Sequence, residues 1–295
     1  MRLHATSLTL LILTTLGCTQ QHSSEPSPHP APAAAERSGT PDNYIGFDSN
    51  DYPGDAALPM LKQHFAFAGY WLTNPPGAHQ NTWTGKRQAL LRNGFGFLVL
   101  ANGRLEAEIK KAKKAGTTPV ALGEKNAAEA VATARREGFP AQTILYLDQE
   151  EGGRLTADQS AYLLAWTEAV ARSGYLPGVY GSGQPVADGP GRTITTAQDI
   201  REQVAAKHLH EIAMWVYQDA CPPANGCTLL QPPASTASGT PDVAAWQYAQ
   251  SPRRKENTAA CSNTYAADGN CYAPELPAFH LDLTVSASSD PSHGR

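Results

Sequence analysis

The chain of 295 residues is long enough for one large domain or two small ones. Its composition, with 41% hydrophobic and 17% charged residues, is that of a soluble globular protein. A formal net charge of -4 gives no electrostatic reason to expect nucleic acid as a partner, because nucleic-acid-binding proteins usually present a basic face. We therefore set that class of partner aside.

The first 18 residues are predicted to be a targeting segment. Arg2 is followed by an apolar run over residues 8–16, which is too short to span a bilayer comfortably but fits the hydrophobic region of a secretory signal. The ending "TLGC" resembles the bacterial lipobox, which implies lipidation of Cys18 and a membrane contact through that lipid. A plain secreted protein is the alternative. Residues 19–43 are rich in Pro, Ser and Ala and are predicted to form a disordered tether.

The strand-like apolar segments follow in chain order, and helix-like segments separate most of the first six. The strand-like segments are "YIGFD" (44–48), "FAFAGYWL" (65–72), "GFLVLANG" (96–103), "TILYLDQE" (143–150), "LPGVYGS" (176–182), "IAMWVYQD" (212–219), "VAAWQYA" (243–249) and "HLDLTV" (280–285). The helical segments are 55–64, 82–93, 104–116, 126–138, 156–174 and 195–208, of which 156–174 is predicted to be the longest.

This alternation implies a parallel sheet with helical crossovers. The 243 residues from Tyr44 to Ser286 are close to the roughly 250 of a (β/α)₈ barrel. A doubly wound open sheet is the alternative, but no G-x-G-x-x-G follows the first strand. We therefore predict an α/β fold, a (β/α)₈ TIM-type barrel over residues 44–286 with degenerate, disulfide-containing C-terminal units, followed by a flexible tail over 287–295.

Four cysteines in the last third of the chain are predicted to form disulfides, since the chain is expected to be exported. They are Cys221, Cys227, Cys261 and Cys271. Local pairs within "CPPANGC" and "CSNTYAADGNC" are the simplest connectivity, and three pairings remain open. Zinc is the competing interpretation, but neither spacing has the C-x-x-C form of a structural zinc site.

Acidic residues stand at three of the predicted strands, at the edge where a barrel of this class carries its active site. They are Asp48, Asp148 with Glu150, and Asp282. Residues i and i+2 of a strand face the same side, so Asp148 and Glu150 are expected to point the same way, about 6–7 Å apart. Glu151 is out of phase and is expected to be a solvated loop residue. The alternative is an ordinary strand that leaves the core into a solvated acidic turn.

Close carboxylates raise one another's proton affinity, so one of them can stay protonated near neutral pH. Such a group can act as the general acid that cleavage of a glycosidic bond requires. Aromatic residues lie at or near the ends of the later strands, where flat rings could stack on sugars, although rings also fill barrel cores. The candidates for substrate binding are Tyr180, Trp215, Tyr217, Trp246 and Gln247, with Tyr248 a further aromatic residue in the same region.

Two patterns that could indicate other chemistry are set aside. "GVYGSGQ" fails the G-x-S-x-G pattern of a nucleophile elbow, because Tyr180 stands where the first glycine is needed. "HLHE" at residues 208–211 lies at a helix end, where the helix dipole favours histidine, and no third ligand is evident. We expect neither a metal site nor a cofactor.

Taken together, six segments resemble a known family. "GFDSN", "YLDQE", "GVYGS", "MWVYQ", "AAWQY" and "HLDLT" occur in the order and spacing of the glycoside hydrolase family 25 lysozymes. They resemble more closely the bacterial glycoside-hydrolase-like TIM-barrel group first called domain of unknown function 1906, over about residues 44–285. The resemblance places the D-x-E motif of the lysozymes on Asp148 and Glu150, with Glu150 as general acid. It places the first-strand aspartate on Asp48 and the terminal aspartate on Asp282, with Thr284 in place of the asparagine that follows in the lysozymes.

The resemblance implies a glycoside hydrolase whose partner is a cell-wall polysaccharide, which a chain exported as its N-terminus predicts, lipid-anchored or secreted, would meet directly. In the lysozymes that polymer is peptidoglycan, cut between N-acetylmuramic acid and N-acetylglucosamine. Asp148 would tune Glu150 or orient the acetamido group of the substrate, and Asp48 and Asp282 would shape the polar floor. A catalytically silent glycan-binding barrel is the second hypothesis, and cleavage of another polysaccharide by a chitinase-like route is the third. Catalysis requires the four carboxylates to converge on one open cleft lined by aromatic residues.

Overall fold

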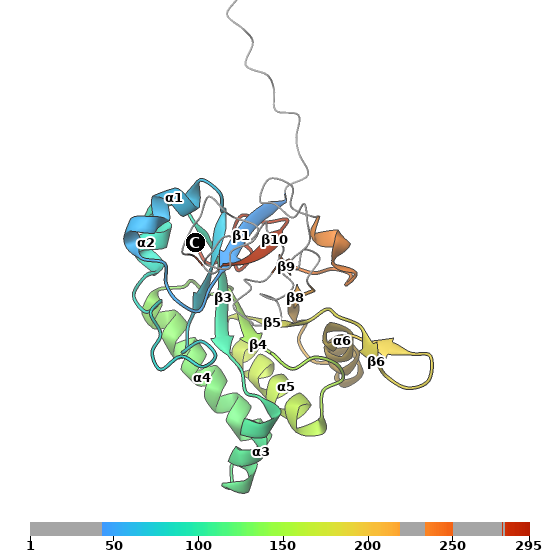
Figure 1. Ribbon diagram of the computed structural model, residues 1–295. Helices are drawn as coiled ribbons and strands as arrows, with labels where there is room; N and C mark the ends of the chain where they lie inside the picture. The colour runs from blue at the N-terminus through green and yellow to red at the C-terminus, as the bar shows by residue number, and fades with distance from the viewer. Residues whose placement is uncertain (1–42, 219–233, 250–278, 280) are drawn as a thin grey trace, which may run out of the picture. The chain divides into compact units, whose positions relative to one another are not determined.

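Eight strands form a closed barrel in the computed structural model, which describes residues 43–218, 234–249, 279 and 281–295 (Figure 1). Around the barrel the order is β1-β10-β9-β8-β5-β4-β3-β2. The strands are β1 (Tyr44–Asp48), β2 (Phe67–Trp71), β3 (Gly96–Asn102), β4 (Ile144–Asp148), β5 (Leu176–Ser182), β8 (Ala213–Tyr217), β9 (Ala245–Ala249) and β10 (Asp282–Ser286). This α/β barrel is compatible with the predicted TIM-type fold. Cys18, the tether up to residue 42 and the four cysteines predicted to pair lie outside the described residues.

Strand β10 departs from the prediction of a wholly parallel sheet. The other seven strands run parallel to one another, whereas β10 runs antiparallel to both of its neighbours, β1 and β9. Antiparallel neighbours need no helical crossover, so the last strand can close the barrel without a further β-α unit. Asp282 is therefore the first residue of its strand rather than a late one. The reversal nevertheless brings it to the edge where the parallel strands end, and it pairs in register with Asp48.

The helices lie outside the barrel, and the three longest of those described each begin at a threonine whose side chain caps the helix. They are η1 (Asp55–Ala57), α1 (Leu58–Lys62), α2 (Arg87–Arg92), α3 (Glu106–Lys114), α4 (Pro119–Glu137), α5 (Ala157–Arg172), α6 (Thr196–Lys207) and η2 (Ser235–Ser238). A two-stranded hairpin of β6 (Val186–Ala187) and β7 (Thr193–Ile194) follows β5. The Thr118 side chain accepts a hydrogen bond from the N–H of Ala121 at the start of α4, and Gly138 ends it at φ 82°.

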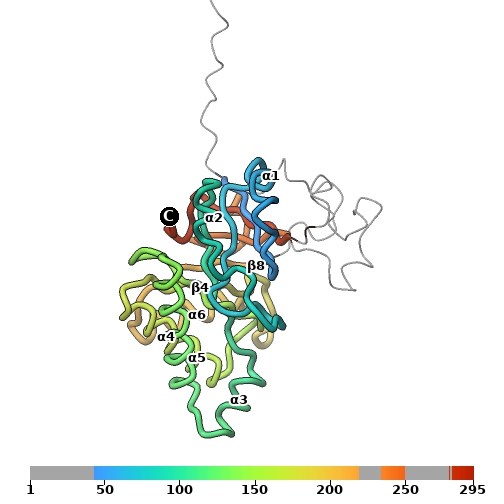
Figure 2. Tube along the Cα trace, turned by 90° about the vertical axis from the view of Figure 1, so that its left-hand side faces the viewer, coloured from blue at the N-terminus to red at the C-terminus, as the bar shows by residue number. Residues whose placement is uncertain are grey.

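Helices α4 and α5 pack side by side against the barrel (Figures 1 and 2). Gly123 allows their close approach, because a Cβ at this position would lie 2.3 Å from the carbonyl oxygen of Tyr162. The longest described helix is α4, with 19 residues, rather than α5, with 16. The reason is that the apolar stretch "PVALG" forms the first turns of α4 instead of interrupting it. None of the helices in the described ranges has the length and apolar character needed to cross a membrane.

The C-terminal segment, predicted to be a flexible tail over residues 287–295, is instead bound to the edge of the barrel where β3 and β4 begin. Ser292 donates its N–H to the carbonyl of Phe97 (2.9 Å), and its hydroxyl and carbonyl oxygens accept from the N–H groups of Val99 (2.9 Å) and Ile144 (2.8 Å). Arg87 of α2 donates to the carbonyl of Gly294 at 2.7 Å, beside the chain end in Figure 2. The small polar residues of this segment satisfy strand-end groups that would otherwise be buried without partners.

Candidate active site

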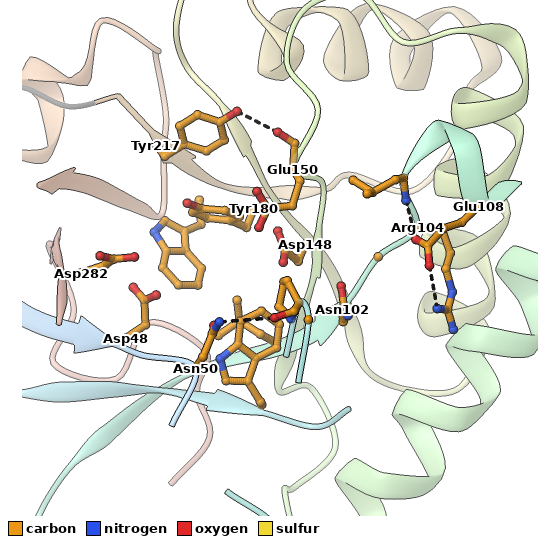
Figure 3. A pocket seen from close by; sticks show the side chains of 17 residues that line it. Asp48, Asn50, Asn102, Arg104, Glu108, Asp148, Glu150, Tyr180, Tyr217 and Asp282 are labelled. Carbon is orange, nitrogen blue, oxygen red and sulfur yellow. Dashed lines mark hydrogen bonds and ion pairs between the residues drawn. The ribbon is translucent and has the colours of Figure 1, made fainter. Parts of the chain in front are cut away.

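The four predicted carboxylates, Asp48, Asp148, Glu150 and Asp282, line one cleft of about 570 Å³ at the edge where the parallel strands end (Figure 3). We call it the acid cleft. Asp48 and Asp148 are the last residues of β1 and β4, and Asp282 is the first residue of the antiparallel β10. Three strand termini therefore deliver carboxylates to one place. The convergence required for catalysis is present.

Two glycines make room for the buried acids. A Cβ on Gly103 would lie 2.0 Å from the carbonyl oxygen of Asp148, and a Cβ on Gly69 would lie 2.5 Å from the Cβ of Asp48. Real Cβ atoms do not approach other atoms this closely, so any larger residue at either position would displace the acid beside it. The sequence therefore leaves space for Asp48 at Gly69 of β2 and for Asp148 at Gly103, the residue after β3.

Asp48 and Asp148 are buried beneath the more exposed Glu150. They are 8% and 3% exposed, and Oδ2 of Asp48 and Oδ1 of Asp148 have no hydrogen-bond partner among the described residues. Burial raises the pKa of Asp148 well above its usual value, and the charge of Glu150 raises it further. Burial also raises the pKa of Asp48, with added contributions from Asp282, Asp148 and Glu150. Both buried aspartates therefore bind a proton more tightly than an ordinary aspartate does.

Glu150 lies beyond the end of β4, in a loop that is fixed on both sides. The Tyr217 hydroxyl donates to the carbonyl oxygen of Glu150 at 3.0 Å, a bond drawn in Figure 3. One residue earlier, the N–H of Gln149 donates to the carbonyl of Tyr180 at 2.8 Å. The Gln149 side chain is buried and does not line the cleft, which fits the alternation of side chains along an extended segment. Glu150 is therefore presented at the cleft by a loop with few degrees of freedom.

Glu151 was expected to be a solvated loop residue, and this prediction is wrong. Its Oε2 accepts a hydrogen bond from the N–H of Glu106, the first residue of α3, at 2.7 Å. The same oxygen accepts from Nε2 of Gln159 on α5 at 2.6 Å. A carboxylate at a helix N-terminus is stabilised by the unpaired N–H groups and by the helix dipole. Glu151 therefore anchors the Glu150 loop to two helices.

Three of the predicted aromatic residues form one wall of the acid cleft. The ring of Tyr180 lies 4.7 Å from that of Trp215 and 5.3 Å from that of Tyr217, measured between centroids. Trp215 is fully buried and supports Tyr180 from below, while Tyr180 and Tyr217 keep part of their surface exposed. The exposed ring surface available to a sugar is therefore that of the two tyrosines.

Trp246 and Gln247, also predicted to bind substrate, do not line the acid cleft. Trp246 pairs in register with Val216 of β8, so it faces the outside of the barrel, and its Nε1 donates to the carbonyl of Gln218 at 2.8 Å. Gln247 pairs with Tyr217 and faces inward, but it is buried below the cleft. Tyr248 faces outward with Trp246, at a ring distance of 6.2 Å.

The cleft also contains residues that the sequence did not single out. They are chiefly Asn50, Trp71, Asn102, Arg104 and Glu108. Trp71 and Asn102 are the last residues of β2 and β3. At the ends of the earlier strands, only acids were selected from the sequence; a search for every sugar-binding side chain at strand ends would also have selected these two residues. Arg104 lies at the far side of the cleft from Asp48 and Asp282 (Figure 3).

No group of three or more His, Cys, Asp or Glu side chains is arranged to hold a metal ion in the part of the chain that the structure describes. His210, from the "HLHE" segment, instead lies 2.9 Å from a carboxylate oxygen of Glu168.

A family model described as "Rv2525c-like, glycoside hydrolase-like domain" matches residues 62–267. The chain therefore belongs to this family, and its barrel is a glycoside hydrolase-like domain. None of the curated proteins compared with the chain matches it.

Several solved structures are similar in fold. An uncharacterized protein of B. stearothermophilus is 20% identical, with a TM-score of 0.48 and coverage of 82% of this chain and 95% of that one. The Tat-secreted protein Rv2525c of Mycobacterium tuberculosis, in complex with HEPES, is 12% identical, with a TM-score of 0.48 and coverage of 86% and 98%. The catalytic domain of endolysin ply40, from bacteriophage P40 of Listeria monocytogenes, is 14% identical, with a TM-score of 0.47 and coverage of 87% and 100%.

Proposed function

We propose that the protein is a glycoside hydrolase that cleaves cell-wall glycan, with Glu150 as its general acid. The observation that carries the proposal is the convergence of four carboxylates, from β1, β4, β10 and the loop after β4, on one open cleft with an aromatic wall. Membership of a glycoside hydrolase-like family supports it. The proposed substrate is peptidoglycan or a related polymer of N-acetylated sugars.

In this mechanism Glu150 protonates the glycosidic oxygen as the bond to the anomeric carbon breaks. Asp148 lies below it, and burial makes its carboxylate an unusually strong proton acceptor. It would accept the acetamido N–H of the substrate and hold the acetamido oxygen toward the anomeric carbon, sharing the positive charge that develops there. Water, deprotonated by Glu150, then releases the product and restores the acid. Asp48 and Asp282 would bind sugar hydroxyls at the cleft floor.

The test is the release of reducing ends from purified peptidoglycan by the wild-type chain and by its Glu150→Gln variant. We expect a loss of about 10²- to 10⁴-fold, the usual contribution of a positioned general acid. Glu124→Gln is the matched control, because Glu124 is an exposed glutamate of α4 in an ion pair with Arg172 and does not line the cleft. Equal activity of the wild-type and Glu150→Gln proteins would refute the role of Glu150.

A glycan-binding barrel without catalysis is the second candidate. The observation that favours it is Thr284, which stands where the lysozymes have asparagine and is fully buried below the cleft. Its short side chain does not line the acid cleft and so offers no group to a substrate bound there. Binding of peptidoglycan without release of reducing ends by the wild-type protein would establish this candidate.

Export is part of the proposal and rests on the N-terminal sequence alone. The apolar run over residues 8–16 and the "TLGC" ending support a secretory signal with a lipid on Cys18. Fractionation of cells that express wild-type and Cys18→Ser chains would test this. Loss of the protein from the membrane fraction only in the variant is expected, whereas a soluble exported wild-type protein would support plain secretion.

A further inference from the structure

A second hollow of about 330 Å³ continues from the acid cleft beyond Arg104. We call it the side hollow. It lies between the loop that follows β2 and helix α4, and it shares Gly77, Asn102 and Arg104 with the acid cleft. Binding pockets for small ligands are usually about 300–1,000 Å³, so the two hollows together can hold a longer ligand than the acid cleft alone. A linear polymer crossing the acids in this direction would enter the side hollow next.

The walls of the side hollow are fixed before any ligand binds. The N–H of Asn102 donates to Oγ1 of Thr73 at 2.8 Å, and its Nδ2 donates to the carbonyl of Asn74 at 3.0 Å, which ties the loop to the end of β3. Arg104 donates from Nε to Oδ1 of Asn126 at 3.1 Å. The same oxygen of Asn126, a buried residue, also accepts from the Tyr162 hydroxyl at 3.1 Å. Little conformational entropy would be lost on binding, because these side chains are already ordered.

The chemistry of these walls suits an uncharged, polar ligand. Hydroxyl, amide, guanidinium and carboxylate groups are supplied by Thr73, Asn74, Asn102, Arg104 and Glu129, and none of the residues that line the side hollow is aromatic. The positive charge of Arg104 is opposed by Glu108, whose carboxylate lies 3.6 Å away, and by Glu129 on the same wall.

The acid cleft beside the side hollow is also lined by carboxyl groups and, among the described residues, adds no compensating positive charge from another Lys or Arg side chain. A negatively charged sugar unit would be disfavoured in the side hollow, whereas the hydroxyl and amide groups of a neutral amino sugar match the donors and acceptors present there.

We propose that the side hollow is a binding subsite for a further, uncharged N-acetylated amino-sugar unit of the glycan, beyond those bound over the acids. The proposal rests on the proposed function and adds to it. Affinity should therefore increase with the length of an oligosaccharide until the side hollow is filled. If the added unit makes two net hydrogen bonds, the gain is about tenfold in the dissociation constant.

The experiment measures the binding of N-acetylglucosamine oligomers of two to six units by calorimetric titration. Ala78 lines the side hollow and not the acid cleft, so Ala78→Trp fills the hollow while leaving the acids in place. Ala141→Trp is the matched control, because Ala141 is an exposed residue of the turn that precedes β4, at the opposite edge of the barrel. We expect the wild-type and Ala141→Trp proteins to gain about tenfold in affinity with length, and Ala78→Trp to bind the shortest oligomers normally without that gain.

The outcomes separate the two proposals. An undiminished gain with length in Ala78→Trp would overturn the side-hollow subsite while leaving the glycan-binding acid cleft intact. Equal affinity of the wild-type protein for every oligomer would also overturn the side-hollow subsite and leave the glycan-binding acid cleft intact. Failure of the wild-type protein to bind any oligomer would overturn the subsite for this sugar, and the reducing-end assay on peptidoglycan would then decide the fate of the proposed function separately.

Discussion

Replacing Asp48 with asparagine should stabilise the fold at neutral pH. Asp48 is 8% exposed, and its Oδ2 has no hydrogen-bond partner among the described residues. Burial and the charges of Asp282, Asp148 and Glu150 raise its pKa. The ionised form is therefore disfavoured in the folded state, and the asparagine variant lacks this unfavourable contribution at neutral pH.

The direction in which the pKa of Asp48 shifts determines how the free energy of unfolding depends on pH. An unfolded chain binds the Asp48 proton with an ordinary pKa of about 3.9, whereas the folded chain binds it more tightly. Binding of this proton stabilises the folded state fully at pH values below the pKa of Asp48 in the unfolded chain. The stabilisation is lost as the pH rises through the pKa of Asp48 in the folded chain. The stability difference between Asp48→Asn and wild type should therefore be small near pH 3.5 and should increase towards pH 7.

The size of the expected stabilisation follows from the missing hydrogen-bond partner of Oδ2 of Asp48. An unsatisfied buried polar group costs about 1–3 kcal/mol, and asparagine removes the charge while keeping one polar oxygen. We expect a gain of about 1–2 kcal/mol at pH 7, which for a domain of this size is roughly 2–8 °C in melting temperature. The gain would come at the expense of function, as is common when active-site strain is relieved.

The assay is thermal unfolding followed by circular dichroism from pH 3.5 to pH 7.5. Asp55→Asn is the control of opposite sign, because hydrogen bonds from Tyr52 and Lys86 lower the pKa of the exposed Asp55. That variant should lose stability at neutral pH and match the wild type in acid. The reasoning is refuted if Asp48→Asn melts at or below the wild-type temperature at pH 7, or if its gain is the same at both ends of the range.

Three further predictions concern the parts that hold the site and the barrel. Tyr217→Phe removes the hydroxyl that donates to the carbonyl of Glu150. We expect kcat for glycan cleavage to fall about five- to tenfold with KM unchanged. A raised KM with an intact kcat would contradict this expectation. Glu151→Ala removes an acceptor shared by donors from α3 and α5, so urea unfolding should show a loss of about 1–3 kcal/mol, with a smaller loss for Glu151→Gln. Deleting residues 291–295 leaves strand N–H groups without partners and should cost about 3 kcal/mol or more, whereas an unchanged melting temperature would show that this segment does not support the fold.

The sequence predicts the barrel and its acids because both depend on local patterns. Apolar runs such as 144–148 mark strands regardless of their neighbours, and an acid at the end of a run lies at a sheet edge in any α/β fold. The direction of β10 depends instead on how the barrel closes, which no local pattern records. Asp282 was nevertheless placed at the correct edge, because the reversed strand begins with it.

The features that local sequence patterns do not determine share one physical cause, which is pairing between distant segments. The face that Trp246 and Gln247 present depends on the register of β9 with β8 and β10. The role of Glu151 depends on helix starts that are remote in sequence. The 287–295 segment has the composition of a mobile tail, yet its short polar groups meet the N–H and C=O groups at the starts of β3 and β4.

The strand that carries Asp282 is also the strand that joins β9 to β1. Until it docks, β1 and β9 are open edges that can pair with other chains, and the acid cleft lacks one of its walls. Docking brings together Tyr44 and Ser286, which are far apart in the sequence, so we expect it to be a late step in folding. A partly folded chain is therefore both prone to aggregate and chemically incomplete. Closure of the barrel acts as a check that a complete active site forms only in a fully folded molecule.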